Sequence, residues 1–209
     1  MFTEILPSKT QETLELLGKQ STLKNFYLSG GTACALHLGH RISEDLDFFT
    51  KRTFSSQNLR DRISELSAFD LLSEDTNTLH CILNKTRLSF LHYKYPLLES
   101  TQKLNTVAIS NLLDVLCTKL DTISARGSKK DFIDVYCAVN QKKYTLEQIL
   151  AAFQKKYHDI SYNLIHILKG LTYFEDADKE DMPRMLTTVS WKETKSFFEK
   201  AVRELENIL

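Results

Sequence analysis

Two aspartates separated by one residue, Asp45 and Asp47, have the residue type and the spacing of a metal site. Side chains two positions apart on a β-strand point to the same face, with Cα atoms about 6.5–7 Å apart. Two carboxylates at about 5 Å repel each other by roughly 3 kcal/mol at an effective dielectric of 20. Such a pair needs a counter-charge, and Mg²⁺ or Mn²⁺ supplies it through oxygen ligands. The alternative interpretation pairs Asp45 with Arg41 and leaves Asp47 at a solvated edge.

A double glycine followed by threonine, Gly30-Gly31-Thr32, precedes the aspartates. A strand that ends in glycines and opens into a helix presents free backbone N–H groups, and the missing Cβ atoms let a phosphate approach closely. Thr32 adds a hydroxyl at the start of the helix. The pattern therefore favours a phosphate-binding turn, and the alternative is an ordinary tight turn with a threonine cap.

Lys119 is the one charged residue of the apolar helical stretch from Val115 to Leu120. An unpaired ammonium is costly in such surroundings, so it must reach solvent or meet an anion. We predict that the amine points toward the Gly30–Thr32 turn and Asp45, where carboxylates or a triphosphate would balance its charge.

A cluster of charges surrounds a predicted helix break at Gly127. Asp131 and Asp134 stand three residues apart and so share one face at the start of the next helix. Ordinary helix-terminus electrostatics explains this pattern as well as a phosphate-binding role does. If the cluster lies at the rim of a site, its cations could contact an RNA backbone; they are Arg126, Lys129 and Lys130.

The spacing of apolar residues predicts an α+β fold, with a small mixed β-sheet and helices in residues 1–105. We expect Ser8 to cap a first helix and Asn84-Lys85 to link two strands as a hairpin. The strands are expected at 25–29, 45–50, 69–73, 78–83 and 86–93, and further helices at 32–38 and 55–66.

Residues 106–209 are expected to be helical and to complete the cleft. Apolar residues recur there at helical spacing in several stripes. The clearest stripes are Leu112, Leu116, Leu120 and Ile123, then Phe132, Val135 and Val139, and then Leu146, Ile149 and Phe153.

Composition places the chain among ordinary globular proteins, with 42% hydrophobic and 26% charged residues and a formal net charge of zero. No run of about eighteen apolar residues is present, so we expect no membrane span. The four cysteines (Cys34, Cys81, Cys117 and Cys137) form no C-x-x-C pair and are expected to be reduced core residues. Together these features predict a cytoplasmic protein.

The turn, the short helix and the Asp-x-Asp strand together resemble the polymerase-β-like nucleotidyltransferase superfamily. More narrowly, the chain resembles the AbiEii/AbiGii toxin nucleotidyltransferases over roughly residues 25 to 195. The first shared block is Gly30-Gly31-Thr32 with His40-Arg41-x-Ser43-x-Asp45-x-Asp47-Phe48, and the second runs from Lys119 to Tyr136.

The resemblance implies transfer of a nucleoside monophosphate from an NTP to a hydroxyl acceptor, with Mg²⁺ or Mn²⁺ as cofactor. In the family the acceptor can be RNA, including the tRNA acceptor end. The implied role is the toxin of a toxin–antitoxin or abortive-infection system, restrained by a separate antitoxin. The implied metal ligands are Asp45 and Asp47, the implied nucleotide-binding residues are Gly30, Gly31, Thr32, Arg41, Ser43 and Arg126, and the other implied catalytic residues are Lys119, Asp131 and Asp134.

The chain departs from the superfamily at one position. Many members carry a third carboxylate on a neighbouring strand, but residues 86–93 contain no Asp or Glu, and Ser89 stands about where it would fall. This leaves two alternatives open: a non-catalytic nucleotide- or partner-binding module, and a phosphotransferase that uses the same site. We assign His40 a structural role, and we expect the histidines outside the motif, including His80, to be packing or surface residues.

Overall fold

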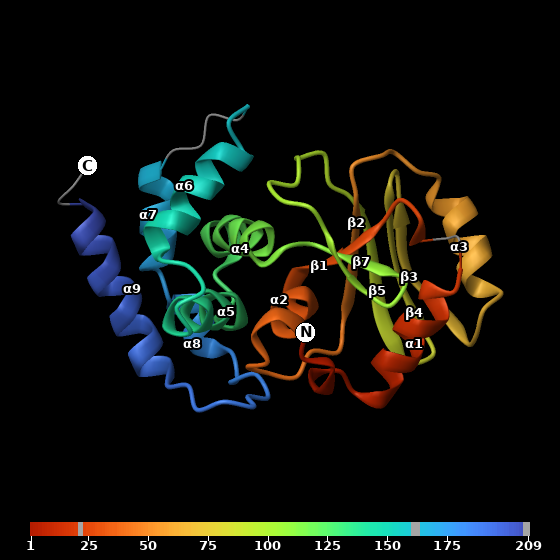
Figure 1. The fold of residues 1–209 in the computed structure, drawn as a ribbon, viewed down its shortest axis with the longest axis horizontal. Coiled ribbons are helices and arrows are strands. Elements are labelled where there is room, and N and C mark those ends of the chain that lie inside the picture. The colour runs from red at the N-terminus through yellow and green to blue at the C-terminus, as the bar shows by residue number, and fades with distance from the viewer. Residues whose placement is uncertain (21–22, 160–163, 207–209) are drawn as a thin grey trace.

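In the computed structural model, the first half of the chain contains a mixed β-sheet (Figure 1). The structure describes residues 1–20, 23–159 and 164–206. Among these residues the strands pair in the order β3-β4-β5-β2-β1-β7-β6. Their bounds are β1 Tyr27–Ser29, β2 Leu46–Thr50, β3 Phe69–Asp75, β4 Thr78–Leu83, β5 Thr86–His92, β6 Gln102–Leu104 and β7 Val107–Ile109.

Strand β2 lies near the middle of the sheet, antiparallel to β1 and parallel to β5. Its side chains alternate between two environments. Leu46 and Phe48 are fully buried, and Phe48 stacks on Phe90 of β5. Asp47 and Phe49 point to the opposite face, because successive residues of a strand alternate. Leu46 and Phe48 thus anchor the strand in the core.

Helices cover the sheet on two sides (Figure 1). Helices α1 (Ser8–Gly18) and α3 (Ser56–Ser64) pack against the β3–β4–β5 part of the sheet. Helix α2 (Gly30–Leu38) continues directly from β1 and packs against α4 (Leu112–Arg126). Helix α2 therefore joins the sheet to the helical half.

The helical half is built around α4, which contacts α5, α6 and α7. Asn111 caps α4, with its side chain accepting from Leu113 N, and Gly127 ends it in the left-handed conformation. The remaining helices are α5 Lys129–Asn140, α6 Leu146–Lys156, α7 Leu164–Leu171, α8 Glu175–Lys179 and α9 Trp191–Glu206, and a short 3₁₀ helix covers Thr3–Ile5.

The segment between α8 and α9 returns to the loop that precedes β2. The backbone N–H of Ile42 donates to Arg184 O, and that of Leu186 donates to His40 O. Arg41 and Met185 form an isolated antiparallel bridge. Residues far apart in sequence thus hold the His40–Ile42 loop in place.

The α+β fold is confirmed, and so are most of the expected elements. Asn84 and Lys85 both have positive φ, as a tight two-residue hairpin requires. The cysteines are free and buried. Within the described residues, no helix has the length and apolar character needed to cross a membrane.

Three expectations were wrong in detail. Strand β7 pairs with β1 and carries the sheet to Ile109, beyond the expected boundary at residue 105. Helix α1 begins at Ser8, but Pro7 is its N-cap residue and no side chain caps it. Strand β2 begins at Leu46, so Asp45 lies at the end of the preceding loop.

Candidate active site

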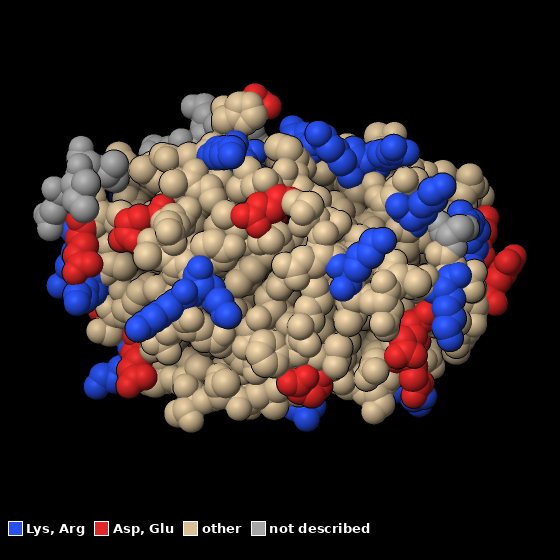
Figure 2. All heavy atoms as spheres, viewed as in Figure 1, with Lys and Arg blue, Asp and Glu red and all other residues tan. Residues whose placement is uncertain are grey.

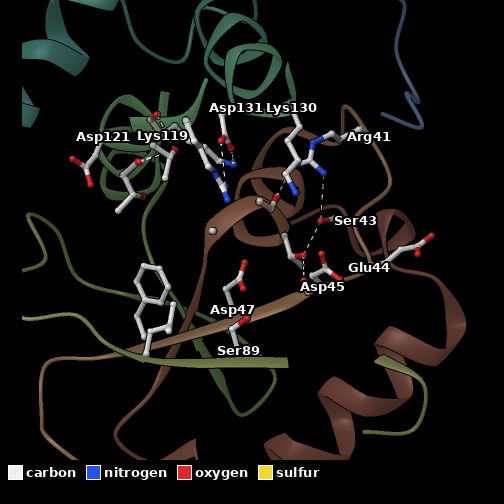
Figure 3. Close-up of a pocket in the computed structure, with 18 of the residues that line it drawn as sticks. Arg41, Ser43, Glu44, Asp45, Asp47, Ser89, Lys119, Asp121, Lys130 and Asp131 are labelled. Atoms are coloured by element: carbon white, nitrogen blue, oxygen red, sulfur yellow. Dashed lines mark hydrogen bonds and ion pairs between the residues drawn. The ribbon is translucent and has the colours of Figure 1, made fainter. Parts of the chain in front are cut away.

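A cavity of about 660 Å³ lies between the sheet, the start of α2, and helices α4 and α5 (Figure 3). Most of the site residues expected from the sequence line it. They are Gly30, Gly31, Thr32, Arg41, Ser43, Asp45, Asp47, Lys119, Arg126 and Asp131. Asp134 does not line the cavity, because it is fully buried beneath the wall.

The glycine turn lies directly against the aspartates and the cations. Gly30 has a φ of +64°, and a Cβ there would lie 2.5 Å from Asp47 Oδ2. A Cβ on Gly31 would lie 2.7 Å from Arg41 Nη2 and 3.7 Å from Lys119 Nζ. Side chains at either position would therefore displace groups of the site, which explains the double glycine.

Thr32 lines the cavity and also contacts the loop that precedes β2. Its hydroxyl contacts the Oγ of Ser43 at 2.7 Å and donates to the carbonyl oxygen of Asp45. The side chains of Thr32 and Ser43 thus fix the loop that carries Asp45. A phosphate at this turn would rely on backbone N–H groups rather than on the threonine hydroxyl.

The two aspartates face the cavity. Asp45 is exposed and Asp47 is half-buried, and in the described part of the chain neither forms an ion pair with a lysine or arginine. Burial raises the pKa of Asp47, a hydrogen bond from Ser89 opposes the increase, and the charge of Asp45 adds to it. The pair therefore has the oxygen ligands and the uncompensated charge that suit a divalent metal ion.

The alternative pairing of Asp45 with Arg41 was wrong. The guanidinium of Arg41 binds Asp134 instead, through Nε at 2.7 Å and Nη2 at 2.9 Å. His40 Nε2 contacts the same carboxylate at 2.8 Å, which agrees with a structural role for this histidine. Burial alone would raise the pKa of Asp134, but Arg41 and Lys119 hold it well below its ordinary value.

Lys119 reaches the turn, as expected, but other carboxylates balance its charge. Its Nζ lies 2.5 Å from Asp131 Oδ1 and 2.8 Å from Asp134 Oδ2. Burial would lower the pKa of Lys119, yet these two charges raise it. The amine is therefore held as a cation beside Gly31, and its charge also lowers the pKa of Asp47.

The rim of the cavity is basic. Arg126 is exposed and lies 3.4 Å from Asp131 Oδ2, and Lys130 also lines the cavity. Lys129, which we expected at the rim, is buried: its Nζ donates to Glu180 O and lies 5.3 Å from the ring centre of Trp191. Only Arg126 and Lys130 of that cluster can meet a ligand in the cavity.

Sequence reasoning missed the open face of the sheet as part of the site. Phe49, Leu91 and His80 line the cavity together with Ser89. A signal was present, because Leu79, Cys81 and Leu83 alternate as buried residues of β4 and so place His80 on the opposite face. Ser89 is the Cα partner of Asp47 on β5, at the position where the missing third carboxylate was expected.

A mixed sheet with a glycine turn and an Asp-x-Asp strand end defines a nucleotidyltransferase-type fold and site. The overall fold is similar to that of a candidate nucleotidyltransferase from H. pylori, with a TM-score of 0.51 and 14% identity, covering 97% of this chain and 99% of that chain. This likeness concerns the fold.

Sequence comparison shows the family. Residues 14–110 match the model of the family described as nucleotidyl transferase AbiEii toxin, type IV TA system. An uncharacterized protein of Aquifex aeolicus (strain VF5) is 36% identical over 207 residues, covering 97% of this chain and 98% of that protein. The chain belongs to the AbiEii family, and its enzyme class is nucleotidyltransferase. The resemblance seen in the motifs is confirmed.

Proposed function

We propose that this chain transfers a nucleoside monophosphate from an NTP to a hydroxyl of an RNA, with tRNA as the first candidate, and does so with Mg²⁺ or Mn²⁺. One observation carries the proposal: Asp45 and Asp47, which form no ion pair with a lysine or arginine of the described residues, line one cavity together with the adjacent glycine turn. The proposed role is that of a toxin restrained by a separate antitoxin, which the family description supports.

Asp45 and Asp47 would hold the metal ion. Their oxygens are the ligand type that Mg²⁺ and Mn²⁺ prefer. Burial, and then the charge of Asp45, raise the pKa of Asp47, so a cation beside the pair would favour its ionised form. When bound, the metal ion supplies positive charge that offsets the charge developing on the phosphates. The turn places this pair next to the site where phosphates would bind.

The triphosphate would lie between the turn and the cations of the helical half. Backbone N–H groups at the start of α2 favour an anion. Lys119 stands beside Gly31 as a buried cation, and Arg126 and Lys130 complete the basic side of the cavity. These groups would stabilise the negative charge of the leaving pyrophosphate.

The nucleoside would occupy the less polar end of the cavity. Phe49 and Leu91 form its wall on the sheet side. Thr118, Thr122 and Ala125 of α4 also line the cavity. Such a slot offers an aromatic face and small side chains to a base, which stacks on aromatic rings without strong preference.

The RNA acceptor would approach over a basic margin. Figure 2 shows lysine and arginine side chains gathered along the upper margin of one face, over the loops that follow β2 and β5 in Figure 1. The exposed cations of those loops are Lys51, Arg52 and Lys94. Phe49 lines the cavity and lies two residues before Lys51, so this margin begins close to the cavity along the chain.

In the reaction, the acceptor oxygen forms a bond to the α-phosphorus while the bond between the α-phosphorus and its bridging oxygen breaks. Pyrophosphate leaves and the acceptor hydroxyl loses its proton. This outcome differs from phosphotransfer, in which the γ-phosphoryl group moves, and from binding without reaction.

Labelled nucleotides separate the three functions in one experiment. Total RNA, and separately purified tRNA, is incubated with the full chain, Mg²⁺ and each NTP labelled on the α- or the γ-phosphate. The proposal expects RNA to gain the α-label only and the Asp45→Asn, Asp47→Asn double variant to transfer none. Transfer of the γ-label would show a phosphotransferase, and NTP binding without transfer of either label would show a binding module.

A further inference from the structure

Three polar side chains form a row across adjacent strands on the open face of the sheet. Asp47 of β2 is the Cα partner of Ser89 of β5, and Ser89 is the Cα partner of His80 of β4. All three line the cavity. Figure 3 shows Ser89 directly beneath Asp47, with both side chains directed into the site.

The hydrogen bonds within this row have a defined direction. An ionised carboxylate can only accept, so the single hydroxyl proton of Ser89 is donated to Asp47. The oxygen of Ser89 must then accept from His80, whose Nδ1 lies 3.2 Å away. With its proton on Nδ1, the neutral imidazole keeps a lone pair on Nε2, which makes this nitrogen a proton acceptor.

Among the other bases that line the cavity, Asp121 extends from α4 rather than from the sheet. Asp131 binds Lys119, and Glu44 lies 3.4 Å from Arg184. Asp45 and Asp47 are the proposed metal ligands. Strand β5, where a third carboxylate would stand, presents Ser89, and His80 extends from the next strand over the same part of the cavity.

We propose that His80 is the general base that accepts the proton of the acceptor hydroxyl; this assignment rests on the nucleotidyl transfer proposed above. The O–H bond of the acceptor breaks as its oxygen bonds to the α-phosphorus, and the proton moves to Nε2 of His80. Pyrophosphate leaves with the electrons of the broken P–O bond. The imidazolium later returns its proton to solvent.

The row is suited to the charge that this step creates. Imidazolium still donates from Nδ1 to Ser89, and Ser89 still donates to Asp47, so no hydrogen bond has to reorganise. The serine thus acts as a positioning residue that fixes the tautomer of His80.

Chemical rescue tests the assignment. Transfer of α-labelled NTP to RNA is measured for the full-length chain, His80→Ala and His80→Gln, with His92→Gln as matched control. His92 is an exposed histidine at the end of β5 and does not line the cavity. Loss of a general base is expected to lower the transfer rate about 10²–10⁴-fold, with NTP affinity unchanged and with wild-type activity in His92→Gln.

Exogenous imidazole provides the decisive readout, because each variant is compared with itself and any loss of folded protein cancels. Imidazole is expected to restore transfer in His80→Ala in a concentration-dependent way, and to leave wild type unchanged. Two outcomes would overturn the role of His80 while leaving the proposed function intact. In one, the wild type transfers label and His80→Ala retains a rate within threefold of it. In the other, His80→Ala loses most of its activity and imidazole does not restore it. Absence of α-label transfer by the wild type would overturn the proposed function, and this inference with it.

Discussion

The guanidinium of Arg41 binds the carboxylate of Asp134 through two nitrogens, although the two residues are 93 positions apart in sequence. Asp134 is completely buried, and it also accepts from His40 and Lys119. Asp134 lies outside the cavity, but it binds Arg41 and Lys119, the two cations that line the cavity. Asp134 therefore contributes by positioning Arg41 and Lys119. This explains how a residue that no ligand can reach can still belong to the site.

Asp134→Asn should destabilise the protein strongly. The change leaves two buried cations without their shared charge, and breaking a buried pair in this way costs about 3–5 kcal/mol. Urea unfolding followed by circular dichroism measures the loss. Asp176→Asn, which removes an exposed pair with Lys179 at 3.0 Å, is the control and should change stability by less than about 1 kcal/mol. Equal effects of the two variants would show that the ion pairs of Asp134 with Arg41 and Lys119 contribute little to the stability of the fold.

Lys119→Met should lower both transfer and stability, and Lys156→Met separates the two effects. Both lysines are buried and ion-paired, but Lys156 binds Asp114 at 2.6 Å and does not line the cavity. We expect Lys119→Met to reduce α-label transfer per folded molecule about 10²-fold or more, and Lys156→Met to retain it. Comparable losses in the two variants would remove Lys119 from the triphosphate site.

Asp47→Asn should stabilise the metal-free protein at neutral pH. Burial and the charge of Asp45 raise the pKa of Asp47 in the folded state, so the folded chain binds more protons than the unfolded chain. Stability from this group therefore falls as pH rises from the unfolded value of about 3.9 through the folded pKa. Unfolding measured at several pH values should show that Asp47→Asn has a higher free energy of unfolding than wild type at pH values above the folded pKa. Below about pH 3.9, the unfolded value, the two should not differ. Asp70→Asn, at an exposed aspartate of β3, is the control and should show no such dependence.

Adding metal ion and nucleotide should make the wild type more stable than the aspartate variants. Wild type should gain thermal stability with Mg²⁺ and an NTP, because a ligand that binds only the folded state stabilises it. The Asp45→Asn, Asp47→Asn double variant should gain none. An equal shift in the double variant would place the metal ion elsewhere.

Gly30→Ala and Gly127→Ala form a matched pair. Both glycines have positive φ, at +64° and +58°, so both substitutions carry a backbone penalty of about 1–2 kcal/mol. A Cβ at Gly127 has its nearest neighbour at 3.7 Å, whereas one at Gly30 lies 2.5 Å from Asp47 Oδ2. Gly30→Ala should therefore lose more stability and also weaken Mg²⁺-dependent NTP binding, measured by calorimetry. Normal NTP binding in Gly30→Ala would contradict the role of the turn.

Replacing Lys51, Arg52 and Lys94 together by glutamine should weaken RNA binding. A protein that neutralises fewer phosphates releases fewer counterions, so the slope of log K against log salt should become shallower. The expected change is about 0.7 for each phosphate of a single strand that is no longer neutralised. Filter binding at several salt concentrations measures it. NTP affinity serves as the control, because these side chains do not line the cavity. An unchanged salt slope would place the RNA elsewhere.

Local patterns predicted much of the fold because each depends on neighbouring residues. The alternation of residues 78–83 matches β4, and the hairpin residues Asn84 and Lys85 have the expected backbone angles. Asp45, Asp47 and the glycine turn were also recognisable, since their chemistry lies in short spacings. The pairing of Arg41 with Asp134 was not, because no local pattern specifies which of several carboxylates a buried cation meets.

His80 shows a second limit of sequence reasoning. Its isolated position on β4 carries no metal-ligand spacing, and only the register with Ser89 and Asp47 brings it to the cavity. Register across three strands depends on the whole sheet and on the hydrophobic side that is buried. The contacts of Thr32 were hidden for a related reason, since its hydroxyl meets a loop that lies eleven to thirteen residues further along the chain.

The backbone bonds from Ile42 to Arg184 and from Leu186 to His40 have a consequence for the protein's synthesis. A ribosome makes the loop before β2 well before residues 184–186, which secure it. The nascent polypeptide therefore carries its Asp-x-Asp motif long before the partner segment emerges. The loop that carries Asp45 therefore gains these two backbone bonds only after residues 184–186 have left the ribosome.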